Sequence, residues 1–424
     1  MKSGRIRVLA AFLSFGTFWG AWGALVPDLQ RQSRVGDGEL GVAILMIGFG
    51  ALCSMRPAGR AVDRWGRPAV TGCVAAMAVA GFLPALATSG TVLVVALMAT
   101  GAASGAMDVA VNALAAAEEV RSGPIMSAAH ACFSAAVVVG AVSSGAILGH
   151  GASLRGLLGI VATVVLGTAA LVHALGHDDR PPRTPGGRRR TPWTRSLVLL
   201  GVFCALAYLV ENAWQSWAAV LLRSAFSSSP QAAALGPALF AAAAAAGRLL
   251  NHRLLAGTAE RSVLIGGALV GAAGTFAAAV APTAPLTLLG VVVAGLGTSV
   301  CAPVILSLAG RVGAVDQRAS AISIVTTLGY SGFLVGPAAV GLTAAATGLR
   351  TALACVGLVA VALAVLGAVV RPGPAPAPSS PPDLRPTPGG GASAQVEAGA
   401  DAAARTWTTG RGGRRVPHHQ DPPE

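Results

Sequence analysis

Two acidic residues lie inside long uncharged stretches of the sequence. Asp108 is the one formally charged residue between Arg67 and Glu118, and Glu211 interrupts a second apolar segment. An ionised carboxylate at the centre of a bilayer costs about 2.5–3.5 kcal/mol on insertion scales, so such a group usually faces a cavity, a partner or a proton path. A carboxyl group shielded from water can load and release a proton near physiological pH. The two positions therefore predict a site that handles protons or a polar solute.

Further polar and aromatic residues accompany the two acids. Asn112 follows Asp108 by four positions and Gln215 follows Glu211 by four, so each acid and its amide share one face of a helix. Amides and carboxylates beside aromatic faces suit sugar-like solutes. Hydrogen bonds between packed helices are the alternative interpretation. His130 is a further candidate for the site, although a packing or interfacial role is favoured for it. The other candidates for the substrate or proton site are Asn212, Trp19 and Trp22, with Trp214 and Trp217 close to Glu211.

The composition indicates the elements that must position these residues. The chain has 424 residues, of which 54% are hydrophobic and 11% charged, and its mean hydropathy is +0.67. Soluble domains carry about 25% charged residues, so we expect a polytopic membrane protein. Its apolar segments are continuous runs rather than alternating stretches of about ten residues, which predicts helices and not barrel strands.

Apolar runs of suitable length predict an all-α protein with twelve transmembrane helices. The first six are expected near residues 7–27, 39–57, 69–88, 91–117, 126–149 and 154–175. The second six are expected near residues 196–222, 231–250, 262–281, 285–309, 319–346 and 351–370.

The positive charges predict the orientation. With both termini inside, the N-terminus and the loops on the same side hold 19 Lys and Arg residues, the opposite loops hold five, and the other six lie in the C-terminal tail. Cytoplasmic loops are enriched in Lys and Arg, so both termini are expected in the cytoplasm of a multi-pass protein of the bacterial inner membrane. The net charge of +13 then follows from topology and indicates no nucleic-acid partner.

The chain divides into two halves of six helices. Residues 1–176 form the first half, residues 177–195 a polar cytoplasmic linker, and residues 196–370 the second half. Residues 371–424 are rich in Pro, Gly and Ala and are expected to be a disordered cytoplasmic tail. Gly59-Arg60 after the second span and Gly247-Arg248 at the end of the eighth are a weak internal repeat, which fits two parallel repeats.

Residues 59–67 read Gly-Arg-Ala-Val-Asp-Arg-Trp-Gly-Arg. This stretch resembles the signature loop between helices two and three of the major facilitator superfamily. Within that superfamily, residues 101–134 and 327–337 resemble the YbjJ-like bacterial inner-membrane transporters near the fucose permeases. The resemblance covers roughly residues 5–370.

The resemblance implies roles for particular residues. The loop is linked to closing the cytoplasmic side, so Gly59, Asp63, Arg64, Gly66 and Arg67 are expected to form a gating loop. Asp63 can accept hydrogen bonds at the start of helix three, while the arginines lie at headgroup level; setting topology alone is the alternative. The fucose-permease relatives carry an acid in helix four that takes part in proton-linked uptake, and Asp108 resembles it in placement. Relatives usually carry acids where this chain has Ser216 and His252, so no role of those acids transfers.

Enzymatic functions find no support in the sequence. It contains no Walker loop, Gly-x-Ser-x-Gly elbow, His-Glu-x-x-His or Cys-x-x-Cys motif, so we expect neither an enzyme nor an ATP-driven pump, and no cofactor or metal site. Residues 36–41 match Gly-x-Gly-x-x-Gly, but a transmembrane helix rather than a strand precedes them. We therefore interpret residues 36–41 as a turn.

These observations predict a secondary transporter that moves a small polar solute by alternating access. Proton-coupled uptake of a sugar-like solute is the leading hypothesis, and a monomer in the lipid bilayer is expected. Two alternatives stay open at this point: proton-antiport efflux of drugs or metabolites, and a membrane sensor that transports nothing.

Overall fold

The computed structural model describes residues 2–175, 193–254, 259–312 and 318–369. All of its regular elements within these ranges are helices, and twelve are long and apolar enough to cross a membrane. The predicted all-α fold with twelve spans is therefore confirmed. The linker expected at 177–195 lies almost wholly outside the described residues, as does the tail expected at 371–424.

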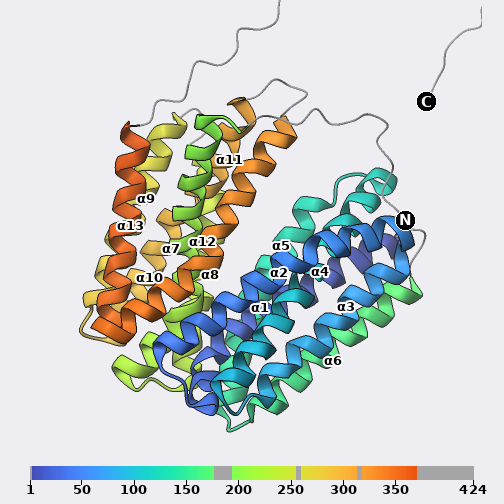
Figure 1. Ribbon diagram of the computed structural model, residues 1–424, viewed down its shortest axis with the longest axis horizontal. Coiled ribbons are helices and arrows are strands. Elements are labelled where there is room, and N and C mark those ends of the chain that lie inside the picture. The colour runs from blue at the N-terminus through green and yellow to red at the C-terminus, as the bar shows by residue number, and fades with distance from the viewer. Residues whose placement is uncertain (1, 176–192, 255–258, 313–317, 370–424) are drawn as a thin grey trace, which may run out of the picture. The chain divides into compact units, whose positions relative to one another are not determined.

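The helices of the first six spans are arranged as one group and those of the last six as another (Figure 1). We call residues 2–174 the N-terminal half and residues 195–369 the C-terminal half. The N-terminal half contains α1 (Lys2–Ser33), α2 (Asp37–Trp65), α3 (Arg67–Phe82) with the 3₁₀ turn η1 (Leu83–Leu86), α4 (Gly90–Ser122), α5 (Met126–Gly149) and α6 (Leu154–Ala174). The C-terminal half contains α7 (Arg195–Phe226), α8 (Pro230–Leu254), α9 (Glu260–Val280), α10 (Ala284–Thr298), α11 (Cys301–Val312), α12 (Arg318–Thr347) and α13 (Leu349–Val369).

Most predicted boundaries agree with these helices within a few residues, but the tenth span is built differently. It runs from Ala284 to Val312 and is divided into α10 and α11. Pro303 lies in the first turn of α11, where its missing N–H leaves the carbonyl of Ser299 without the usual helical bond. The proline therefore accounts for the break in this span.

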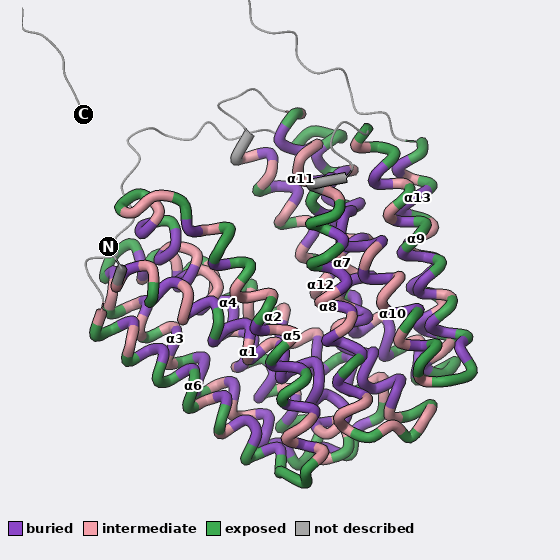
Figure 2. Tube along the Cα trace, turned by 180° about the vertical axis from the view of Figure 1, so that it is seen from behind, coloured by how far each residue is buried: buried purple, intermediate pink, exposed green. Residues whose placement is uncertain are grey.

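Glycines allow the helices inside each half to pack closely. A Cβ atom at Gly101 of α4 would collide with the carbonyl oxygen of Ile47 in α2, and one at Gly332 of α12 would collide with that of Ala205 in α7. Small residues at such crossings let two backbones approach, which is how helices associate in lipid. Figure 2 shows the outcome as buried stripes along the facing sides of helices whose other faces are exposed.

The halves touch one another at one end of the molecule. Gly41, near the start of α2, lies against Pro337 and Gly341 of α12, and Gly145, near the end of α5, lies against Ala234 of α8. The motif of residues 59–67 lies at the end of α2, and we call that side of the molecule the motif end. The contacts between the halves lie at the start of α2, and we call that side the opposite end. The cavity described next lies between the halves and is lined by α1, α2, α4 and α5 on one side and α7, α8 and α12 on the other.

Candidate functional site

A cavity of about 410 Å³ lies between the two halves. Its polar lining is drawn from both halves, and six aromatic rings complete it. The polar residues are Ser104, Asp108, Ser134, Glu211, Asn212, Gln215, Ser216 and Arg248, and the aromatic ones are Phe15, Trp19, Trp22, Phe133, Tyr330 and Phe333. A concave, largely apolar site with a few convergent polar groups is the usual form of a small-molecule site.

The N-terminal half contributes one carboxylate to this cavity. Asp108 lies on α4, and Asn112 donates its side-chain N–H both to Asp108 Oδ1, at 3.1 Å, and to the Asp108 backbone carbonyl, at 2.9 Å. Asn112 itself does not line the cavity; it supports the acid from one turn further along the helix. The predicted shared face of the two residues is thus present, with the acid as the group that faces the cavity.

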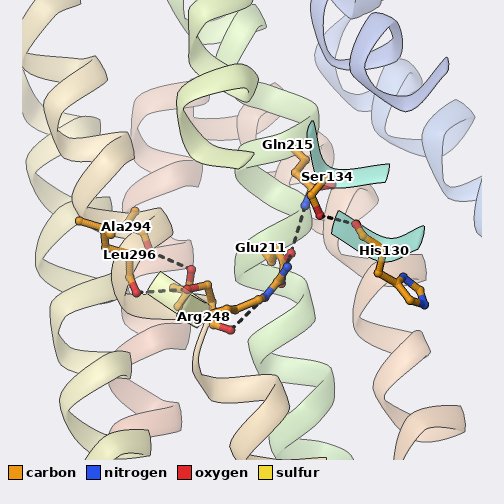
Figure 3. Close-up of polar contacts among 9 residues, drawn as sticks. His130, Ser134, Glu211, Gln215, Arg248, Ala294 and Leu296 are labelled. Carbon is orange, nitrogen blue, oxygen red and sulfur yellow. Dashed lines mark hydrogen bonds and ion pairs between the residues drawn. The ribbon is translucent and has the colours of Figure 1, made fainter. Parts of the chain in front are cut away.

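The C-terminal half contributes a carboxylate that is paired with a cation. Glu211 Oε1 on α7 accepts hydrogen bonds from Arg248 Nη2 of α8 at 2.9 Å and from Gln215 Nε2 at 3.3 Å (Figure 3). Arg248 Nε also donates to the carbonyl oxygen of Ser299 at 3.3 Å, which ties α8 to the end of α10. The Glu211 side chain is 9% exposed and that of Arg248 is 43% exposed, so the arginine is the member that is open to the cavity.

Arg248 is a residue of the candidate site that the sequence did not predict. Gly247-Arg248 was expected to mark a cytoplasmic helix end, but α8 continues to Leu254 and Arg248 lines the cavity. One signal could have revealed it. Pro237, Ala241, Ala244 and Arg248 follow one another at steps of four, three and four residues, which place them on one helical face, and all four line the cavity.

Asn212 and Ser216 reinforce α7 where it faces the cavity. Asn212 donates its side-chain N–H to the Phe333 carbonyl of α12 at 2.7 Å and accepts a hydrogen bond from Ser216 Oγ at 3.1 Å. Ser216, where relatives were expected to carry an acid, thus takes part in a neutral hydrogen-bonded group. These contacts fix α7 against α12 and hold Glu211 and Gln215 on the cavity side.

The aromatic residues fall into lining and packing groups. Trp19 and Trp22 line the cavity as expected, and their ring centroids lie 6.3 Å apart. Trp214 and Trp217 are fully buried inside the C-terminal half, and Trp214 Nε1 donates to Thr275 Oγ1 at 3.1 Å. Those two rings therefore hold helices together instead of facing a solute.

The structure places His130 outside the cavity. Its ring packs edge-on against Phe12 with centroids 5.1 Å apart, and Figure 3 shows the imidazole directed away from Glu211 and Gln215. Its backbone carbonyl accepts a hydrogen bond from Ser134 Oγ at 3.0 Å. This geometry agrees with the packing or interfacial role that the sequence favoured.

The motif of residues 59–67 is mostly helical instead of forming a loop. Helix α2 continues through Trp65, and the chain turns at Gly66, whose φ of 59° favours glycine. Asp63 and Arg64 are exposed, and the Arg64 guanidinium lies 5.6 Å from the Trp65 ring centroid. Gly66 is the N-cap residue of α3 and, as a glycine, supplies no side-chain hydrogen bond to the start of that helix.

Metal chemistry finds no ready site within the described ranges. No three His, Cys, Asp or Glu side chains gather there in a way that could hold an ion. The cavity lining offers hydrogen-bonding groups, one ion pair and aromatic faces.

Solved structures share the fold of this chain. The nucleoside transporter NupG superimposes with a TM-score of 0.71 at 14% identity, covering 86% of this chain and 98% of the other. A D-xylose-proton symporter superimposes with a TM-score of 0.67 at 14% identity, covering 86% and 96%. At such identities the likeness shows the arrangement of helices alone.

Curated relatives match most of the sequence. An uncharacterised MFS-type transporter of Yersinia pestis is 33% identical over 371 residues, which cover 85% of this chain and 94% of the relative. An uncharacterised transporter, y4wD, of Sinorhizobium fredii is 29% identical, covering 86% and 97%. The family model described as Major Facilitator Superfamily matches residues 8–255 and 197–413. The chain therefore belongs to the Major Facilitator Superfamily and is a secondary transporter of a solute.

Proposed function

We propose that this transporter takes up a small polar solute together with a proton, and that Asp108 is the proton site. The observation that carries the proposal is the unequal pairing of the two cavity carboxylates. Glu211 has Arg248 as a counter-ion, whereas Asp108 makes its recorded side-chain contact with the neutral amide of Asn112. Arginine keeps its charge at every physiological pH, so protonating Glu211 would leave a cation without its partner.

The position of Asp108 supports this role. It lines the cavity between the halves, where water and solute would reach it, and it lies near the middle of α4 (Gly90–Ser122). A carboxylate at that depth is costly when ionised, and binding a proton removes that cost. The same proton would be released when the site opens to the side with the lower proton concentration.

Alternating access is proposed to occur between the two halves as units. The positive-inside rule supports placing the motif end and both termini in the cytoplasm of a bacterial inner membrane. With that orientation, the contacts between the halves at the opposite end would lie on the periplasmic side. The YbjJ-like group near the fucose permeases is the proposed subgroup, on the resemblance of residues 101–134 and 327–337.

The test is uptake of labelled sugars, sugar acids and small metabolites into proteoliposomes under an imposed proton gradient. Wild type is compared with Asp108→Asn and with Glu39→Gln, a matched carboxylate-to-amide control. Glu39 is exposed at the start of α2 and accepts a hydrogen bond from the Gly36 N–H at 3.1 Å, which a glutamine can replace. Uptake driven by the gradient is expected in wild type and in the control and is expected to be lost in Asp108→Asn.

The outcomes separate the candidate functions. Solute extrusion driven by the same gradient would support proton-antiport efflux in place of uptake. Gradient-driven uptake that survives in Asp108→Asn would remove Asp108 from the proposal. No flux in either direction for any solute would favour a sensor that uses the fold without transport.

A further inference from the structure

The Glu211 carboxylate differs from that of Asp108 because it orients an arginine, Arg248. The Arg248 guanidinium is fixed at two points, by Glu211 Oε1 at 2.9 Å on one side and by the Ser299 carbonyl oxygen at 3.3 Å on the other. These contacts use N–H groups on Nη2 and Nε, out of the five that an arginine carries. The Arg248 side chain is 43% exposed and lines the cavity, so it is an oriented donor that can form further hydrogen bonds.

The side-chain amides near the cavity already donate hydrogen bonds within the protein. The amide of Asn112 donates to Asp108, that of Asn212 to the Phe333 carbonyl, and that of Gln215 to Glu211. Arg248 is the one cation among the described lining residues, so it is the donor best placed to receive an anionic acceptor group of the solute. A planar guanidinium fork matches the geometry of a carboxylate, to which it can donate two parallel hydrogen bonds.

The charges of the lining residues give a second, independent argument. The lining residues that carry a formal charge at neutral pH are Asp108, Glu211 and Arg248, which sum to one negative charge when all are ionised. One proton on Asp108 brings the sum to zero. A solute with one carboxylate then restores the charge of the empty cavity, so the proton offsets the repulsion that an anionic solute would otherwise meet.

We propose that Arg248 binds a carboxylate group of the solute and that Glu211 is the positioning residue that orients the guanidinium. The solute class is thus an organic acid with further hydroxyl or amide groups, of the size of a sugar acid. This inference rests on the function proposed above and specifies the solute of the same cavity. It also assigns the two acids different tasks, with Asp108 for the proton and Glu211 for the arginine.

The test measures binding with matched pairs of probes that differ in one group. Thermal unfolding of the purified transporter in detergent is followed with glucuronate against glucose and with galacturonate against galactose. A ligand that binds the folded protein raises its unfolding midpoint in a concentration-dependent way. We expect at least one acid to raise the midpoint of wild type while its neutral partner does not.

The variants are chosen to separate a binding role from a structural one. Arg248→Gln should weaken the apparent affinity for the acid by at least about tenfold, because a charge-assisted bond is lost. Arg311→Gln is the matched control: Arg311 is also paired with a glutamate, Glu260, at 2.6 Å, but lies outside the cavity. It should leave the acid-dependent rise unchanged.

Two further variants guard against a folding defect and test the positioning role. The double variant Glu211→Gln with Arg248→Gln removes both charges together, so it should recover the unliganded midpoint of wild type without recovering acid binding. Glu211→Gln alone should weaken acid binding yet keep the dependence of uptake on the proton gradient. A merely structural role for Glu211 would not separate these two readouts.

Several results would overturn the proposal. These are equal stabilisation by an acid and its neutral partner, acid binding retained in Arg248→Gln, and no stabilisation of wild type by either acid up to tens of millimolar. Gradient-driven uptake of neutral sugars that depends on Asp108 would preserve the proposed function while removing the carboxylate. The absence of all gradient-driven flux in wild type would instead count against the proposed function itself.

Discussion

The cavity contains the same local pattern twice, with different results. Asp108 with Asn112 on α4 and Glu211 with Gln215 on α7 are both an acid followed four residues later by an amide that donates to it. In the C-terminal half, Arg248 from α8 adds a cation to the pattern. The same spacing on two helices therefore gives one acid that is bonded to a neutral amide and one acid that is paired with an arginine, and the arginine comes from a third helix.

The two Gly-Arg repeats also differ in whether their arginine lines the cavity. Arg248 lines the cavity, whereas Arg60, which follows Gly59 at the corresponding place in the N-terminal half, is exposed and does not. The N-terminal half does have a buried pair between Arg7 and Glu118, at 3.7 Å, but Glu118 lies ten positions beyond Asp108, or about 15 Å along α4. Both halves thus contain arginine–glutamate pairs, and among those that the described residues form, the pair of Glu211 and Arg248 is the one that lies in the cavity.

The largest expected effect comes from removing the acid without a counter-ion. Asp108→Asn should lower gradient-driven uptake at least about 100-fold, because an amide cannot carry the proton, and should abolish the dependence of uptake on external pH. Initial rates in proteoliposomes across a range of pH measure both. Retention of the wild-type pH dependence in this variant would mean that the two acids are not distinguished as we describe.

The next effect concerns the arginine that distinguishes the halves. Arg248→Ala leaves Glu211, 9% exposed, without its counter-ion, and should destabilise the protein by about 1–3 kcal/mol, below the roughly 3–5 kcal/mol of a fully buried pair since the arginine is partly solvated. Thermal unfolding in detergent measures the loss. Glu211→Gln in the same chain should restore most of it, and the absence of such rescue would contradict the pairing.

A smaller effect is expected at the motif end, at Asp63 of the motif of residues 59–67. Asp63→Asn should slow transport by about tenfold or less while leaving solute affinity near that of wild type, since Asp63 is exposed and lies outside the cavity. Single-turnover uptake and equilibrium binding separate the two quantities. Transport at the wild-type rate would remove the gating role and leave these charges with topology alone.

The smallest effect should come from an ion pair between the halves. Asp28 at the end of α1 lies 3.9 Å from Arg223 Nη2 of α7 and also contacts Arg31. The Asp28 and Arg223 side chains are partly buried, 15% and 17% exposed, but their charged groups are as far apart as an ion pair allows, so Asp28→Asn should cost about 1 kcal/mol and shift the balance between conformations only a few-fold, away from the one described here. Distances between spin labels on α2 and α12 at the opposite end report that balance, and an unchanged distribution would show that the pair does not stabilise this conformation.

The fold could be predicted from the sequence because a long continuous apolar run crosses a bilayer as a helix, which satisfies its own backbone hydrogen bonds. The twelve spans, and the shared face of Asp108 and Asn112, follow from hydropathy and helical periodicity alone. Of the residues predicted for the site, six line one cavity and two, Asn112 and His130, do not; the six are Asp108, Glu211, Asn212, Gln215, Trp19 and Trp22. A polar residue within an apolar helix costs free energy in the bilayer, so such residues are rare and are easily recognised in the sequence as candidates for a site.

The rest could not be predicted because it depends on contacts between helices far apart in sequence. Arg248 was assigned to a helix end, since spacing along α8 does not show that Glu211, 37 positions earlier, lies opposite it. His130 resembles the other polar residues in sequence, yet its helix turns it toward Phe12. Trp214 and Trp217 flank the cavity residues of α7 but are fully buried and do not line the cavity. Whether each of these side chains faces the cavity depends on how its helix is rotated about its own axis.

One measurement tests the central claim most directly: proton-gradient-driven uptake and equilibrium binding of the same solute by Asp108→Asn and Glu211→Gln, side by side. We predict opposite losses, with Asp108→Asn losing the gradient dependence and Glu211→Gln losing affinity while keeping that dependence. If Glu211→Gln loses the gradient dependence and Asp108→Asn retains it, the assignment of the proton to the acid without a counter-ion is wrong.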